Sequence, residues 1–132
     1  MVRIYDFRIM ILDLKYMSDK IKMGKEGENQ AAEFLQKKGF AIVARNYRHK
    51  HAEIDLIVKK GDFIVFVEVK TRSYSFYGEP EAFVDSRKAA TVLRAAEQYT
   101  YDNKYEGNIR FDIVSVKTGS TPEAVHFEDA FH

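Results

Sequence analysis

Two carboxylates and a lysine lie in a pattern that could support hydrolytic chemistry. Asp55 belongs to the segment EIDLIVKK, and Glu68 and Lys70 belong to FIVFVEVKTR, with Gly61-Asp62 between the two segments. A glycine followed by an aspartate between two apolar runs is a hairpin signal. If these two residues form the turn, Asp55 faces Glu68 across the paired strands.

A second register of the same hairpin stays open. If the turn is Lys60-Gly61, Glu53 faces Glu68 and Asp55 lies diagonally close. Either register gathers acids on one face, where like charges destabilise a sheet. Bound Mg²⁺ or Mn²⁺ would relieve this repulsion, because Mg²⁺ prefers hard oxygen ligands. The backbone carbonyl of Val69 is a further candidate ligand.

Two more side chains could complete such a site. Lys70 projects from the same face as the second acid and could orient an attacking water or stabilise developing negative charge. Glu28 lies three residues before Ala31 and seven before Leu35, so helical spacing puts it on or beside an apolar helix face. There it could hold a second ion or a coordinated water. Together these parts suit phosphodiester hydrolysis.

The elements that must position these side chains follow from the spacing of apolar residues. A first helix is expected over residues 19–38, capped by Ser18 or Asp19 and ended by Gly39. A second helix is expected over residues 86–103, and strands over residues 40–48, 53–60, 63–72, 108–117 and 124–127. The order α-β-β-β-α-β-β predicts an α/β protein with a mixed central β-sheet flanked by helices.

Side-chain alternation predicts which face of the sheet each side chain of the middle strands occupies. A regular strand would put Ile54 on the same face as Leu56 and Val58, with Asp55 on the opposite face. The following strand is apolar on both faces as far as Phe66, which predicts a central strand covered on both sides.

Length and the N-terminal sequence bound the domain organisation. A chain of 132 residues favours one domain. We expect residues 19–132 to form a single domain and residues 1–18 to be an extension. The extension has three interpretations: a stretch before a true start at Met17 or Met23, an added edge strand, or a dimer contact.

Composition excludes several classes of function. The chain has no cysteine, which excludes disulfides, zinc-thiolate sites and thiol nucleophiles and agrees with a cytoplasmic location. Lys and Arg number 21 against 20 Asp and Glu, so a phosphate-binding surface requires local segregation of charge. No stretch approaches the apolar length of a membrane-spanning helix, so no membrane partner is expected.

Basic side chains near the acids could contact a phosphate backbone. The candidates are Arg45, Arg48, Lys50, Arg72 and Lys88. The alternative for the first three is an exposed turn with solvated charges, in which His49 and His51 are simple turn residues. Tyr74, Phe76 and Tyr77 could stack on bases or line a dimer interface, but packing within their own loop is the favoured interpretation.

Several sequence motifs resemble a known family. The pattern D-x₁₂-E-x-K resembles the nuclease superfamily named for its PD-(D/E)xK motif. The strings GKEGENQAAEFLQKKGF, ARNYR, AEIDLI, FVEVKTR and RFDIV resemble, in this order, the YraN-type family. That is an uncharacterised bacterial family with an endonuclease-like fold, similar to archaeal Holliday-junction resolvases. The resemblance covers about residues 24–116.

The resemblance implies a restriction-endonuclease-like core and a role for each matching residue. Asp55 and Glu68 match the metal-binding acids, Lys70 matches the motif lysine, and Glu28 matches the helix acid of resolvase-like members. The residue before the first acid, a proline in much of the superfamily, is Ile54 here. Where the family usually has glycine before Glu-Ile-Asp, this chain has alanine, which removes no ligand.

The resemblance therefore implies a Mg²⁺- or Mn²⁺-dependent nuclease acting on DNA, branched DNA included. A homodimer would suit such a substrate, because resolvase relatives and branched DNA share two-fold symmetry. Two alternatives stay open: a non-catalytic nucleic-acid-binding or assembly module that keeps the fold, and a pure protein-interaction domain.

Overall fold

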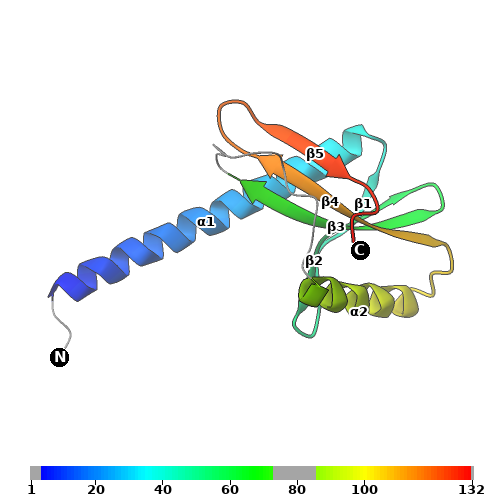
Figure 1. Cartoon of the computed structure of the whole chain (residues 1–132), viewed down its shortest axis with the longest axis horizontal. Coiled ribbons are helices and arrows are strands. Elements are labelled where there is room, and N and C mark those ends of the chain that lie inside the picture. Colours follow the sequence, from blue (N-terminus) through cyan, green and yellow to red (C-terminus); the bar gives the residue numbers. More distant parts are fainter. Residues whose placement is uncertain (1–3, 73–85, 132) are drawn as a thin grey trace.

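A computed structural model describes residues 4–72 and 86–131 of the chain. The elements, in chain order, are α1 (Ile4–Lys37), β1 (Ala41–His49), β2 (Ala52–Lys60), β3 (Phe63–Arg72), α2 (Ser86–Asp102), β4 (Asn108–Lys117) and β5 (Glu123–Phe127) (Figure 1). This order confirms the predicted α-β-β-β-α-β-β arrangement and the α/β fold class. The aromatic residues Tyr74, Phe76 and Tyr77 fall outside the described residues, so their predicted roles stay predictions.

The five strands form one mixed sheet in the order β1-β2-β3-β4-β5. The β3–β4 pair is parallel, and the other three pairs are antiparallel. Lys60 pairs with Phe63, so Gly61-Asp62 is the turn, and Gly61 takes a positive φ of 61° that glycine adopts without strain. The alternative Lys60-Gly61 turn is therefore wrong.

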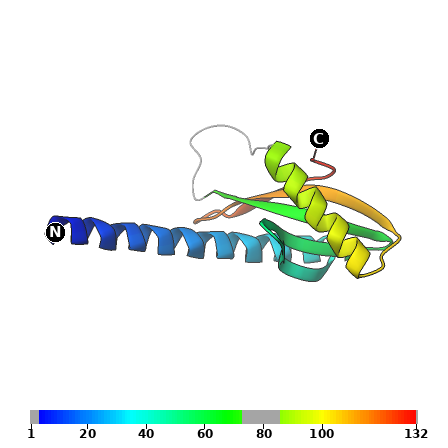
Figure 2. The same cartoon turned by 90° about the horizontal axis from the view of Figure 1, so that it is seen from below.

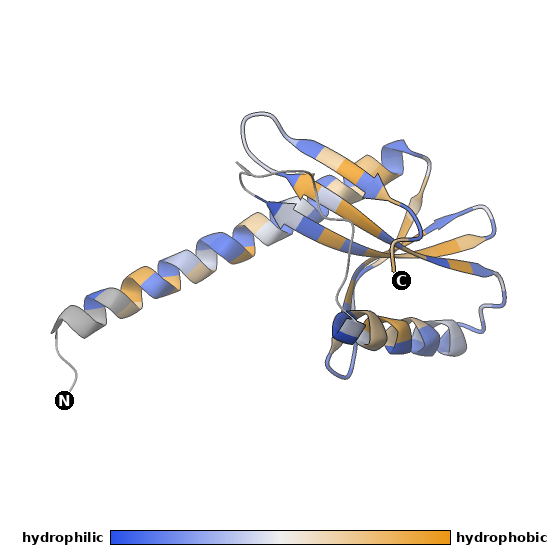
Figure 3. Ribbon diagram, viewed as in Figure 1, coloured by the Kyte–Doolittle hydropathy of each residue, from blue (hydrophilic) through white to orange (hydrophobic). Residues whose placement is uncertain are grey.

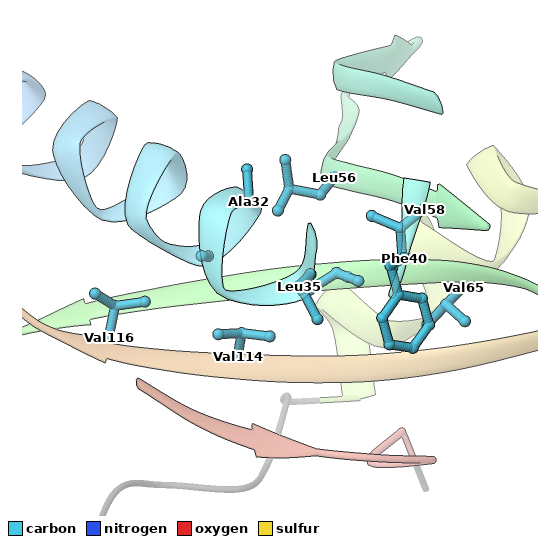
Figure 4. Close-up of a cluster of buried hydrophobic side chains, with 10 residues drawn as sticks. Ala32, Leu35, Phe40, Leu56, Val58, Val65, Val114 and Val116 are labelled. Atoms are coloured by element: carbon cyan, nitrogen blue, oxygen red, sulfur yellow. The ribbon is translucent and has the colours of Figure 1, made fainter. Parts of the chain in front are cut away.

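The two helices cover opposite faces of the sheet, with α1 on one side and α2 on the other (Figure 2). Under α1, Leu35 packs against strand residues that include Leu56, Val65 and Val114 (Figure 4). Under α2, Phe66 belongs to the cluster that lies against the helix. The prediction that the third strand is central and covered on both faces is confirmed.

The regular alternation predicted for β2 is wrong at one point. Leu56 packs in the cluster under α1, whereas Ile54 packs in the cluster under α2, although a regular strand would put them on one face. Asn46 and Asp55 fall between the pairs Arg45–Leu56 and Tyr47–Ile54, and Asn46 has a φ of 50°. Asn46, the left-handed residue on β1, therefore lies beside the point on β2 where the side-chain alternation breaks. Asp55 is the residue at that break.

The first helix is much longer than predicted. It begins at Ile4 instead of near Asp19, so the predicted cap at Ser18 or Asp19 is wrong, as is the edge-strand interpretation for residues 4–18. The early turns extend away from the sheet and expose apolar side chains such as Leu14 (60%) and Ile21 (70%) (Figures 1 and 3). Within the described ranges, neither helix has an apolar stretch long enough to cross a bilayer.

Candidate functional site

Asp55 lies where the central strands β2 and β3 stop pairing. The ladder between them runs from Lys60–Phe63 to Leu56–Val67. Beyond that last pair, the Oδ2 atom of Asp55 accepts a hydrogen bond of 2.7 Å from the backbone N–H of Val69. A side chain thus satisfies a β3 amide beyond the last pair, which fixes the carboxylate between the two strands.

Two further carboxylates gather around Asp55. One oxygen each from Glu28, Glu53 and Asp55 lies within 4.8 Å of the others, and these three residues are called the acid trio below. Glu28 comes from α1, and Glu53 and Asp55 come from β2. The side-chain amide of Asn46 donates to Glu28 Oε2 at 3.1 Å and to Glu53 Oε1 at 2.9 Å. Arg48 makes an ion pair with Glu53 at 3.3 Å. Donors on β1 therefore hold Glu28 and Glu53, and the β3 amide of Val69 holds Asp55.

A glycine allows α1 to bring Glu28 to the sheet. Gly27 is buried, and a Cβ atom at this position would collide with the side chain of Thr71 on β3. Only a residue without a side chain permits this approach. The glycine directly before Glu28 therefore sets the distance between the helix carboxylate and the sheet.

Glu68 lies beside the trio but has its own partner. Its side chain is 8% exposed, and Lys88 at the start of α2 donates to its Oε1 in an ion pair. The hairpin count placed Glu68 directly against Asp55. In the structure Glu68 pairs with Lys88 and is not one of the three trio residues, while its charge still acts on Asp55. Lys70 follows on β3 with a partly buried side chain, opposite Ser115 of β4.

The electrostatics of the site centre on Asp55. Burial, followed by the negative charges of Glu68 and Glu28, raises the pKa of Asp55 to about 8, against the lowering effects of the Val69 hydrogen bond and the Lys88 charge. The Asp55 carboxyl is therefore a group that the folded protein ionises reluctantly. A nearby positive charge would make its ionised form favourable.

The donor set fits a small divalent cation. Ligand oxygens on one Mg²⁺ ion lie within roughly 4 Å of each other, so the 4.8 Å trio needs only small side-chain adjustments. Each carboxylate oxygen has two acceptor positions, so the existing hydrogen bonds leave capacity for a cation. The structure gives Val69 an amide contact to Asp55, and the predicted role of its carbonyl stays a prediction.

A hollow of about 380 Å³ between α1 and β1 leads to the trio. Its lining includes Glu28 and Asn46 together with two basic residues, Lys25 and Arg45. Arg45 donates to the side chain of Asn29 at 2.6 Å, which orients it along the helix. This hollow gives the acids a route to the surface that basic side chains flank.

The predicted phosphate-contacting residues lie around this centre in different ways. Arg48 and Lys88 touch carboxylates of the site itself. Lys50 is exposed on the turn between β1 and β2, and Arg72 is exposed at the end of β3. The structure thus brings Arg45, Arg48 and Lys88 to the acids and leaves the other two at the periphery.

Sequence reasoning did not assign Glu53 or Asn46 to the site. Glu53 appeared only in the alternative register, as a partner of Glu68. Its signal was indirect, because it follows from the loss of alternation on β2 around Asp55. Asn46 offered a better clue: asparagine is depleted in strands and tolerates positive φ, so its place within a predicted strand marks an irregularity.

A second acid, Asp112 in the RFDIV motif, is buried on β4 but belongs to a different network. It accepts from Arg110 Nε at 2.8 Å, from His126 Nε2 at 2.7 Å and from the amide of Asp129 at 2.9 Å. Lys38 donates to the other ring nitrogen of His126 at 2.6 Å. Burial favours a higher pKa for Asp112, but the bonds from His126 and Arg110 outweigh it and hold the pKa below its ordinary value. This network ties β4 to β5 and stabilises the fold.

The fold and the site together define a mixed α/β protein. Its carboxylates lie close together where the pairing between β2 and β3 ends. The chain belongs to the UPF0102 family, described as an uncharacterised protein family, whose match spans residues 27–116. Similar members include UPF0102 proteins of Flavobacterium psychrophilum (42% identical, covering 88% of this chain and 98% of the relative) and Rhodococcus jostii (39%, covering 87% and 100%). A UPF0102 protein of Chloroherpeton thalassium is 43% identical over 76% of this chain and 78% of its own length.

Proposed function

We propose that this protein is a divalent-cation-dependent nuclease that hydrolyses phosphodiester bonds in DNA, branched DNA included. The observation that carries the proposal is the acid trio, in which α1 and β2 bring three carboxylate oxygens within 4.8 Å of each other. The resemblance of Asp55, Glu68 and Lys70 to the PD-(D/E)xK pattern adds support.

The roles of the chain's own residues follow from their positions. Glu28, Glu53 and Asp55 would hold Mg²⁺ or Mn²⁺. When bound, the cation supplies positive charge that polarises a phosphate toward attack. Glu68 fixes Lys88 at the edge of the site, where the ammonium can contact a phosphate oxygen. Lys70 lies two residues further along β3 and would stabilise the negative charge that develops during cleavage.

Cleavage assays with matched variants test the proposal. The purified protein is incubated with four-way junction, flap, duplex and single-stranded DNA in Mg²⁺, in Mn²⁺ and in a chelator. Asp55→Asn and Glu68→Gln should abolish cation-dependent cutting, while Asp19→Asn, an exposed aspartate on α1, should leave it unchanged. Cutting that survives both site substitutions would remove the assignment.

A non-catalytic nucleic-acid-binding or assembly module is the second candidate. The observation that favours it is the Glu68–Lys88 ion pair, which occupies one of the expected ligands with an internal partner. Calorimetry separates the two candidates: absence of Mg²⁺ and Mn²⁺ binding, together with salt-dependent DNA binding, would favour the module. A homodimer is part of the proposal for branched substrates and is tested by sedimentation with and without junction DNA.

A further inference from the structure

The turn between β1 and β2 forms a basic hollow with α2, separate from the acid trio. The hollow has a volume of about 160 Å³. It is lined by His49, Lys50, His51, Ala52, Thr91 and Arg94. None of these six residues is acidic, although the chain as a whole carries nearly equal numbers of acidic and basic residues. The hollow is thus a local concentration of positive charge.

Packing against α2 makes this hollow a built feature of the fold. Ala52, at the start of β2, belongs to the same buried cluster as Val92 and Ala95 of α2. Helix α2 therefore packs against the β1–β2 hairpin. Arg94, next to the buried Ala95, is exposed at the edge of this helix–hairpin contact. Lys50 takes a φ of 56°, which turns the chain sharply and places its exposed side chain at the mouth.

Two elements, β2 and α2, each carry residues of both the hollow and the candidate site. On β2, Ala52 lines the hollow and the next residue, Glu53, belongs to the acid trio. On α2, Lys88 pairs with Glu68, and Arg94 follows six residues later, which is about 9 Å along a helix. At about 3.4 Å per nucleotide along one strand, these 9 Å correspond to about three nucleotides.

We propose that this hollow binds a phosphate group of the same nucleic-acid strand that enters the candidate site, so the inference rests on the proposed function. The planar guanidinium of Arg94 matches phosphate oxygens in a bidentate manner, and Lys50 adds a compact charge. The imidazole N–H groups of His49 and His51 are further donors. An adjoining hollow along α2 shares His49 and Arg94 with this one and includes the acidic side chain of Glu97.

The test measures DNA binding apart from cleavage. Fluorescence anisotropy of labelled four-way junction and duplex DNA is recorded in a chelator over a range of salt concentrations, with the Asp55→Asn protein as the common background. The variant Lys50→Gln/Arg94→Gln removes two exposed cations of the hollow. The control Arg8→Gln/Lys59→Gln removes two exposed cations elsewhere, so both double variants have the same net charge.

The hollow variant should bind about tenfold more weakly than the control. Its plot of log K against log salt should be shallower by about 1, because one phosphate contact is lost. Equal affinity and salt dependence for the two variants would overturn the inference and leave the proposed function intact. A protein that binds DNA through the hollow but does not cut would keep the inference and overturn the nuclease. Failure to bind any of the DNA probes would overturn both.

Discussion

Replacement of Asp55 by asparagine should stabilise the cation-free protein at neutral and alkaline pH, even though Asp55 lies at the centre of the candidate site. In the folded protein the pKa of Asp55 is raised to about 8, first by burial and then by the charge of Glu68. In the unfolded chain the pKa of Asp55 should be near its ordinary value of 3.8. Asparagine keeps an oxygen that can accept the Val69 hydrogen bond and removes the charge.

The sign and the size of the effect follow from this difference. The folded state holds the proton more tightly than the unfolded state, so the stability contributed by protonated Asp55 is complete below about pH 4 and is lost as the pH rises toward 8. The slope is at most about 1.4 kcal/mol per pH unit. Between pH 5 and pH 7 the wild-type protein should therefore lose up to roughly 3 kcal/mol relative to Asp55→Asn.

Urea unfolding at several pH values, in a chelator, measures this difference directly. The free energy of unfolding of wild type minus that of Asp55→Asn should fall steadily from pH 5 to pH 7. Asp19→Asn, on the exposed part of α1, serves as the control and should follow the wild-type profile. Parallel profiles for the wild type and Asp55→Asn would contradict the raised pKa of Asp55, because they would show that the folded protein ionises this carboxyl without cost.

Three further substitutions test the packing and the charges around the site. Gly27→Ala forces α1 away from Thr71 and should cost about 1–3 kcal/mol in urea unfolding and weaken Mn²⁺ binding in calorimetry; unchanged values would contradict the close approach. Asp112→Asn removes the charge at the centre of a buried network and should cost roughly 3 kcal/mol at pH 7. That cost should shrink below about pH 4, because the lowered pKa confines this contribution to higher pH, and a pH-independent cost would contradict it. Lys88→Met removes a charge that lowers the pKa of Asp55, so the pH midpoint of Mn²⁺ binding should rise, and an unchanged midpoint would exclude this coupling.

Local sequence signals predicted most of the fold. The predicted strand 63–72 matches β3 at both ends, because the strand is an apolar run that begins directly after a turn signal. The Gly61-Asp62 turn then set the register, since each residue counted back from the turn has one partner. The predicted start of α1 was wrong because apolar and charged residues alternate irregularly before Met17. Ser18, the predicted cap, lies inside a continuous helix and caps nothing.

Residue spacing was enough to predict that Asp55 and Glu68 lie on neighbouring strands and that Glu28 lies on a helix. Which carboxylates meet depends on the tertiary structure. The irregularity around Asp55 brings Glu53 into the acid trio, and the packing of α2 supplies Lys88 to Glu68. Both outcomes depend on contacts between segments far apart in the chain. The close approach at Gly27 and the docking of α2 on the hairpin are such contacts, and no local pattern encodes them.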